Sequence, residues 1–66
     1  MTNEMIANII EEAQFFSAKK RCTIAVMSNG ERLTYINLDH GCSLRWMKED
    51  GYWVAAIFEN GYRVEA

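Results

Sequence analysis

The residues best suited to catalysis lie close together in the middle of the sequence: Asp39, His40 and Cys42. A cysteine becomes a nucleophile when an imidazole within hydrogen-bond reach takes its proton, and the spacing of His40 and Cys42 allows both side chains to point to one side. Gly41 lies between them, and this glycine favours a turn that reverses the chain. Nothing else in the sequence supplies an oxyanion site or a cleft. We therefore expect a turn and no enzyme, with a small thiol-dependent enzyme as the weakest alternative.

The sequence also has too few residues of the kind that bind a metal ion. A structural zinc site takes four ligands, but the chain has only two cysteines, Cys22 and Cys42, and one histidine, and it has no Cys-x-x-Cys pair. Both cysteines fall at apolar positions of expected strands, where a free thiol behaves as a small hydrophobic group. We expect two reduced, buried thiols, no metal and no cofactor.

A third kind of chemistry is the stacking of nucleic-acid bases. Trp53, with Arg45 and Arg63 on neighbouring expected strands, resembles an aromatic and basic sheet face that binds single-stranded nucleic acid. Seven basic residues against nine acidic ones give a net charge of -2, however, which provides no long-range attraction for phosphates. Binding of single-stranded nucleic acid is therefore an alternative that we do not favour.

An amphipathic helix is expected over residues 3–19. Thr2 or Asn3 can cap its first turn, and Glu4 complements the positive end of the helix dipole. One face of the helix is apolar, through Met5, Ile6, Ile9, Ile10, Ala13 and Phe16. Phe15 points away from that stripe, either covered by the connection that follows the helix or exposed as an anchor for a partner.

From residue 22 onward the hydrophobic period changes to two, as in β-strands. Turn dipeptides recur about every ten residues, and they supply the positive φ angles of tight hairpins: Asn29-Gly30, Asp50-Gly51 and Asn60-Gly61. These signals predict an antiparallel meander over about 22–65, with strands at 22–27, 32–38, 42–48, 52–58 and 62–65. The apolar positions also change face near Tyr35, which predicts a bulge there.

These elements predict one α+β domain over residues 1–66, with the helix packed on one face of a four- or five-stranded antiparallel meander. The alternative is a small SH3-like barrel with an added N-terminal helix. The expected core contains Ile9, Ile10, Phe16, Leu44, Trp46, Val54, Ala56 and Phe58. The opposite face of the sheet is then expected to carry the remaining residues of the third and fourth strands.

The segment 52–58 has apolar residues on both faces, and a single helix can cover only one of them. A second chain is the expected cover, so we predict a homodimer or higher oligomer. The interaction surface is expected to centre on Trp53, with Ile57, Arg45 and Met47 around it, and Phe15 is a further candidate contact. Trp46, in contrast, is expected inside the core.

Size and composition narrow the class of function. A chain of 66 residues is near the lower limit for a core without disulfides or metals, and association stabilises such a chain. No uncharged run approaches 18 residues, so we expect no signal peptide, no membrane span and a cytoplasmic protein. The favoured function is non-catalytic protein binding, as an inhibitor or accessory protein that occludes a partner protein's surface. Such small proteins include those of phages and mobile elements, for example anti-defence inhibitors; the sequence does not name the partner.

Overall fold

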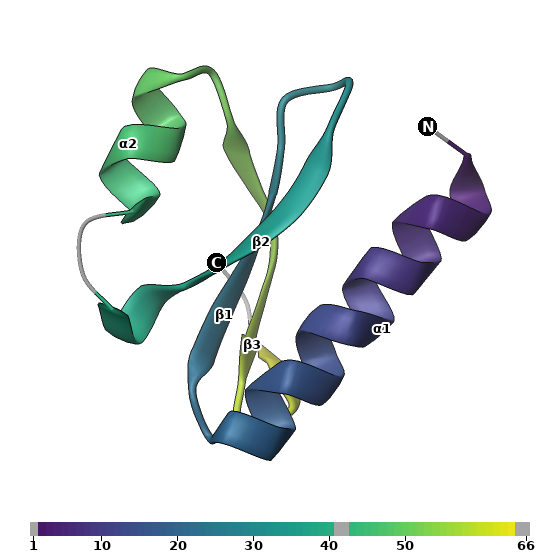
Figure 1. Cartoon of the computed structure of the whole chain (residues 1–66), viewed down its shortest axis with the longest axis vertical. Helices are drawn as coiled ribbons and strands as arrows, with labels where there is room; N and C mark the ends of the chain where they lie inside the picture. The colour runs from purple at the N-terminus through teal and green to yellow at the C-terminus, as the bar shows by residue number, and fades with distance from the viewer. Residues whose placement is uncertain (1, 41–42, 65–66) are drawn as a thin grey trace.

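A computed structural model describes residues 2–40 and 43–64 of the chain. The described elements are α1 (Asn3–Lys20), β1 (Thr23–Ser28), β2 (Leu33–Asn37), the 3-10 turn η1 (Leu38–His40), α2 (Ser43–Glu49), β3 (Trp53–Glu59) and β4 (Tyr62–Val64). They form an α+β fold in which α1 packs on an antiparallel sheet of four strands, and the sheet does not close into a barrel (Figure 1). Neither helix in the described ranges is both long and apolar enough to cross a membrane.

The N-terminal helix confirms the sequence prediction almost to the residue. The Thr2 hydroxyl accepts a hydrogen bond from the backbone N–H of Met5 at 3.2 Å, which caps the first turn of α1. The helix ends at Lys20, and the C-cap residue Arg21 has a left-handed backbone (φ 51°) with its N–H bonded to the carbonyl of Ser17. Lys19 and Lys20 lie in the last turn, where positive charge is favourable.

The sheet is not the predicted meander, because its strand order is β2-β1-β3-β4. β1 forms a hairpin with β2 on one side and pairs antiparallel with β3 on the other. The chain therefore leaves β2 at one edge of the sheet and returns to the far side of β1. This route requires a longer connection than a hairpin, and η1 and α2 supply it.

The strand predicted at 42–48 is wrong, since Ser43–Glu49 is the helix α2. The Asp50-Gly51 pair ends this helix and does not turn a hairpin: Gly51 has φ 88°, the Tyr52 N–H donates to the Met47 carbonyl, and the Gly51 N–H donates to the Lys48 carbonyl. This is the Schellman arrangement of a helix C-terminus. A glycine with positive φ serves either structure, so the dipeptide alone does not distinguish them.

The two helices lie on opposite sides of the sheet (Figure 1). As a result, β1 is buried on both faces: Ile24 and Val26 on the α1 side, Ala25 and Met27 on the other side, are all at most 1% exposed. The sequence analysis expected a second chain to cover the second face of the sheet. Part of that face is instead covered within this chain. Trp46, predicted in the core, is on α2 and 66% exposed, so that prediction is wrong.

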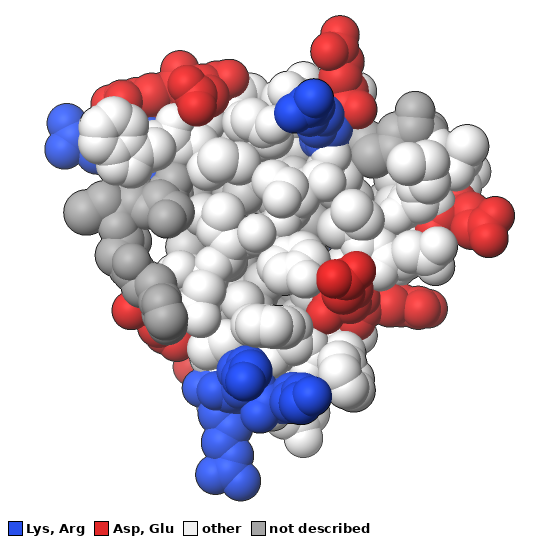
Figure 2. Space-filling model, viewed as in Figure 1, with Lys and Arg blue, Asp and Glu red and all other residues white. Residues whose placement is uncertain are grey.

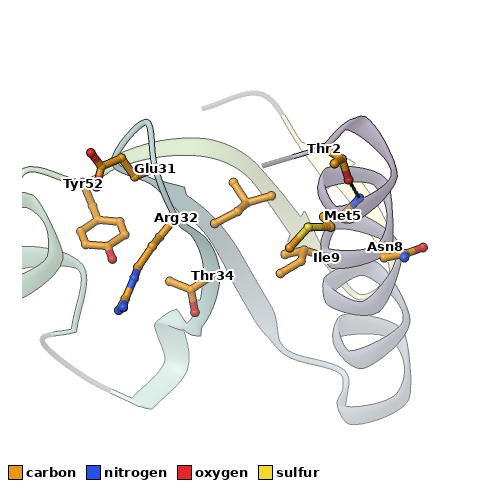
Figure 3. A pocket seen from close by; sticks show the side chains of 9 residues that line it. Thr2, Met5, Asn8, Ile9, Glu31, Arg32, Thr34 and Tyr52 are labelled. Atoms are coloured by element: carbon orange, nitrogen blue, oxygen red, sulfur yellow. Dashed lines mark hydrogen bonds between the residues drawn. The ribbon is translucent and has the colours of Figure 1, made fainter.

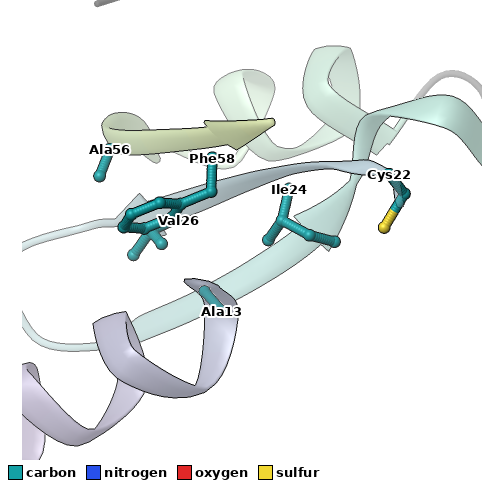
Figure 4. Close-up of a cluster of buried hydrophobic side chains, with 6 residues drawn as sticks. All are labelled: Ala13, Cys22, Ile24, Val26, Ala56 and Phe58. Carbon is teal, nitrogen blue, oxygen red and sulfur yellow. The ribbon is translucent and has the colours of Figure 1, made fainter. Parts of the chain in front are cut away.

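The core lies between α1 and the sheet (Figure 4) and contains Ala13, Cys22, Ile24, Val26, Ala56 and Phe58. Of the predicted core residues, Ala56 and Phe58 are buried, and Ile9, Ile10 and Phe16 pack against the cluster while partly exposed. Leu44 and Val54 are only half-buried. The core is thus centred on β1. Its residues Ile24 and Val26 are not among the core residues that the sequence analysis expected.

The C-terminal end of α1 is held to the β3–β4 turn by a small polar contact. Ser17 is fully buried; its hydroxyl donates to the Cys22 carbonyl at 3.0 Å and accepts from the Gly61 N–H at 2.9 Å. The Gln14 side-chain amide donates to the Gly61 carbonyl at 2.9 Å. These bonds join the last turns of α1 to the β3–β4 turn and to the start of β1.

A β-bulge is present, but not at the predicted place. The β1–β2 register passes through Tyr35 without a shift, whereas the β1–β3 register shifts between Val26 and Met27. Ala55 is the extra residue, because Val26 faces Ala56 and Met27 faces Val54. Because of this extra residue, the side chains of Val54 and Ala56 point to opposite faces of the sheet, although the two residues are two positions apart.

Candidate protein-binding site

A groove of about 760 Å³ lies beside the start of β2. One wall is the N-terminal half of α1, and the other is formed by the start of β2 and the residue before β3 (Figure 3). The groove is lined by Thr2, Met5, Asn8, Ile9, Glu31, Arg32, Leu33, Thr34 and Tyr52. The lining is more apolar than polar, and its two charged members, Glu31 and Arg32, have opposite signs. The groove therefore suits an apolar segment of a protein more than a nucleotide.

The groove follows an unpaired strand edge. β2 is the first strand of the described sheet, and β1 is its only neighbour among the described strands. The Asn29 N–H donates to the Arg32 carbonyl, and in an antiparallel pair such bonded pairs alternate with unbonded ones. Every second residue of β2 after Arg32 therefore bonds β1 through its backbone, which selects Thr34 and Ile36. The backbone groups of the residues between them point away from β1: Leu33, Tyr35 and Asn37.

Trp53 adjoins the hairpin at the same end of the sheet. Its register partner is Ser28, whose other neighbour is Leu33, so these three residues form one row across three strands. A Cβ atom added at Gly30 would lie 3.6 Å from the Trp53 ring, so the indole lies along the hairpin turn. Trp53 is 52% exposed and Met5, in the groove, is 55% exposed. Two large apolar side chains are thus open to solvent at this end of the molecule.

The structure does not bring the five predicted binding residues together on one surface. Arg45 and Met47 are on α2 and not on a strand; Arg45 is exposed, 3.6 Å from Glu49, and Met47 is half-buried. Ile57 pairs with Ala25, whereas Trp53 pairs with Ser28. Because Ala25 and Ser28 point to opposite faces of β1, Ile57 and Trp53 do too.

Phe15, the fifth predicted contact, is exposed on α1. The Lys19 ammonium lies 5.9 Å from the centre of its ring, a weak cation–π contact at the surface. The arrangement predicted for base stacking is also absent from the described sheet: Trp53 is on β3, Arg45 is on α2, and Arg63 on β4 pairs with Phe58.

The predicted nucleophile group is only partly described. Cys42 and the side chain of His40 lie outside the described residues. Asp39 has structural contacts: its carboxylate accepts the Thr23 N–H at 3.1 Å, and its own N–H donates to the Asn37 side chain at 2.9 Å. Cys22 is a free, buried thiol, as predicted. Among described residues, no three His, Cys, Asp or Glu side chains are grouped to hold a metal ion.

One titratable group beside the β2 edge is perturbed. The Tyr35 hydroxyl donates to the Glu12 carboxylate at 2.7 Å, and its ring packs beside Phe16 with centroids 6.2 Å apart. This hydrogen bond, with burial and the negative charge of Glu12, raises the pKa of Tyr35. The contact ties β2 to α1 and leaves the outward backbone of Tyr35 accessible at the sheet edge.

The sequence analysis missed the groove because its lining comes from α1, from the start of β2 and from the residue before β3, which only the tertiary structure brings together. Strand order makes β2 an edge of the described sheet, and the bulge places Trp53 in the row of Ser28 and Leu33. Comparisons with known proteins add no assignment: no family model matches the chain, and no curated protein or solved structure matches it.

Proposed function

We propose that this chain is a non-catalytic protein-binding module whose contact surface is the groove beside β2 together with Trp53. The observation that carries the proposal is a pair of half-exposed apolar side chains, Met5 in the lining of a mainly apolar groove and Trp53 beside the hairpin turn that adjoins it. Tryptophan and methionine are enriched at the centres of protein interfaces, where their burial supplies most of the binding free energy. A protein seated in this groove would have part of its own surface covered, which is how a small inhibitor or accessory protein acts.

The surface charge supports a protein partner over a nucleic acid. In the view that looks onto β2, the centre of the molecule is mostly uncharged and the charged side chains gather toward the margins (Figure 2). Phosphate binding requires clustered lysine and arginine, and the net charge of the chain is -2. An uncharged surface with a charged rim is the pattern of a protein interface.

Quantitative affinity capture from cells of the source organism tests the proposal. Tagged wild-type chain is compared with Trp53→Ala, Met5→Ala and the control Tyr62→Ala, which removes a 77% exposed aromatic side chain on β4. We expect a protein that is captured by the wild type and by the Tyr62 variant, and that is reduced at least tenfold by either groove variant while circular dichroism shows an intact fold. Equal capture by all four chains would contradict the proposed surface.

A further inference from the structure

The chain contains two Asn-Gly pairs, Asn29-Gly30 and Asn60-Gly61, and each lies in a hairpin turn of the sheet. Glycine has no Cβ atom, so the backbone nitrogen that follows each asparagine is sterically unhindered. That nitrogen can attack the side-chain amide of the asparagine and convert it without an enzyme. Because the dipeptide is the same at both places, a large difference in reactivity between them has to come from the structure.

The reaction joins the glycine nitrogen to the asparagine Cγ and expels the side-chain nitrogen as ammonia. The proton that the backbone nitrogen gives up leaves with the ammonia, and the product is a cyclic succinimide. Water then opens the ring at one of its two carbonyls, which yields aspartate or isoaspartate. Ring closure requires rotation of the planar peptide unit between the two residues, so the glycine N–H must first leave its hydrogen-bond acceptor.

The pair Asn60-Gly61 is held in place by α1. The Gly61 N–H donates to the Ser17 hydroxyl at 2.9 Å, and the Gly61 carbonyl accepts from the Gln14 side chain at 2.9 Å. A Cβ atom added at Gly61 would lie 2.7 Å from the Cβ of Ala18, so the backbone has little room to rotate. Rotation also removes a donor from a fully buried hydroxyl, which carries the free-energy cost of an unsatisfied polar group.

The pair Asn29-Gly30 makes its hydrogen bonds within its own turn. The Gly30 N–H donates to the Ser28 hydroxyl at 3.2 Å, and the Asn29 N–H donates to the Arg32 carbonyl at 3.2 Å. Gly30 is exposed, and the side chain that lies along it, the ring of Trp53, is half-exposed. Opening this turn therefore breaks local bonds and leaves the contact between α1 and the sheet undisturbed.

The same turn polarises the side chain that is attacked. The Asn29 Oδ1 atom accepts the backbone N–H groups of Glu31 at 2.9 Å and of Arg32 at 2.7 Å. Both donors draw electron density from Cγ, and negative charge develops on Oδ1 when the glycine nitrogen adds to Cγ. Donors directed at a developing oxyanion lower the barrier to acyl transfer. The turn thus combines an accessible nucleophile with a polarised carbonyl.

We propose that Asn29 is a site of spontaneous deamidation in the folded chain, that Asn60 is protected, and that conversion of Asn29 alters the groove. Aspartate at this position adds a negative charge beside Glu31, which lines the groove. Isoaspartate adds a backbone atom inside the turn that the bond between Asn29 and Arg32 closes. Glu31, Arg32 and Leu33 all belong to the lining, so either product changes that wall. The effect on binding rests on the proposed function, whereas the reaction itself does not.

Peptide mass spectrometry on chain incubated at neutral pH tests the reaction. Trypsin cleaves after lysine and arginine, so it separates the two sites into the peptides 22–32 and 49–63. We expect Asn29 to deamidate at least tenfold faster than Asn60 in the folded chain, and the two rates to lie within threefold of each other in urea. Equal rates in the folded chain, a faster reaction at Asn60, or a tenfold difference that persists in urea would overturn the proposal.

Ser17→Ala tests the protection of Asn60, because it removes the acceptor of the Gly61 N–H. We expect the Asn60 rate to rise at least threefold and the Asn29 rate to stay within twofold of the wild type. An unchanged Asn60 rate in the folded variant would contradict protection by α1. If Ser17→Ala fails to fold, Gln14→Ala provides the same test at an exposed position, since Gln14 donates to the Gly61 carbonyl.

The effect on the groove is tested with the two forms of the chain. Ion exchange separates the deamidated chain, which carries one more negative charge, from the unmodified chain, and both are used in the affinity capture described above. We expect the deamidated form to capture at least fivefold less of the cellular protein. Equal capture by both forms would refute the effect on the groove. No capture by either form would refute the proposed function and leave the two deamidation rates to decide the modification site.

Discussion

Two glycines with the same backbone conformation are expected to respond very differently to substitution. Gly51 and Gly61 both have φ of 88°, which strains any residue with a Cβ atom by about 1 to 2 kcal/mol. A Cβ at Gly51 meets nothing within 4 Å, whereas one at Gly61 would lie 2.7 Å from the Cβ of Ala18 on α1. Overpacking of this kind adds roughly 1 to 3 kcal/mol. Gly61→Ala should therefore destabilise the fold by about 2 to 5 kcal/mol, and Gly51→Ala by only about 1 to 2 kcal/mol.

Urea unfolding followed by circular dichroism measures both values, and Ala18→Gly provides the matched control. That change alone should cost about 1 kcal/mol in helix propensity. Combined with Gly61→Ala it removes the colliding methyl group, so the double variant should be more stable than the sum of the single effects predicts. Equal losses for the two glycine variants, or strictly additive effects in the cycle, would refute the close contact between α1 and the β3–β4 turn.

Three further predictions concern the fold. Ser17→Ala removes two hydrogen bonds at a fully buried position, so it should destabilise the chain by about 1 to 3 kcal/mol, measured by the same urea titration. Trp46→Ala should leave the fold intact because the side chain is largely exposed, whereas Phe58→Ala, in the core, should cost about 3 to 5 kcal/mol; thermal melts of the two variants separate these results. The raised pKa of Tyr35 means that the folded state holds the phenol proton more tightly than the unfolded state does. This contribution is present below the ordinary pKa of about 10 and is lost as pH rises through the raised value, so Tyr35→Phe should reduce the loss of stability measured in alkaline buffers.

Local signals in the sequence account for most of the elements. The capping threonine, the apolar stripe and the basic last turn place α1 correctly, and alternating residues and Asn-Gly turns place β1, β2, β3 and β4. At Asn60-Gly61 both residues have positive φ (52° and 88°), as a two-residue hairpin requires. These features depend on neighbours within a few positions, which is why the sequence alone predicts them.

The second helix shows where local signals conflict. The strand predicted over 42–48 rests on the glycine-containing turn that follows it and on the alternating apolar residues within it. Ser43–Glu49 has Leu44 and Met47 three residues apart and Arg45 and Glu49 four apart, the spacing of contacts along a helix. Helix propensity favoured the second interpretation, since leucine, arginine, methionine, lysine and glutamate are all good helix formers. This error also produced the incorrect core position of Trp46.

Strand order is the part that the sequence does not reveal. β1 has a continuous apolar run because it lies between two other strands and between two helices. A meander whose second face is covered by another chain would show the same sequence pattern. The candidate site depends on this order, because β2 is an edge only when β1 pairs with both β2 and β3. Trp53 is 52% exposed, but the expectation that it lies on the sheet face opposite α1 is wrong: it pairs with Ser28, on the face that carries Ile24 and Val26, because of the bulge at Ala55, which no local signal marks.

The most direct test of the central claim compares capture of a cellular protein by the wild-type chain, by Met5→Ala and by Tyr62→Ala, with the fold of each variant checked by circular dichroism. Met5 lines the groove, whereas Tyr62 is exposed on β4. The account predicts that Met5→Ala reduces capture at least tenfold and that Tyr62→Ala leaves it unchanged. Equal capture by all three chains, or a loss with Tyr62→Ala alone, would contradict it.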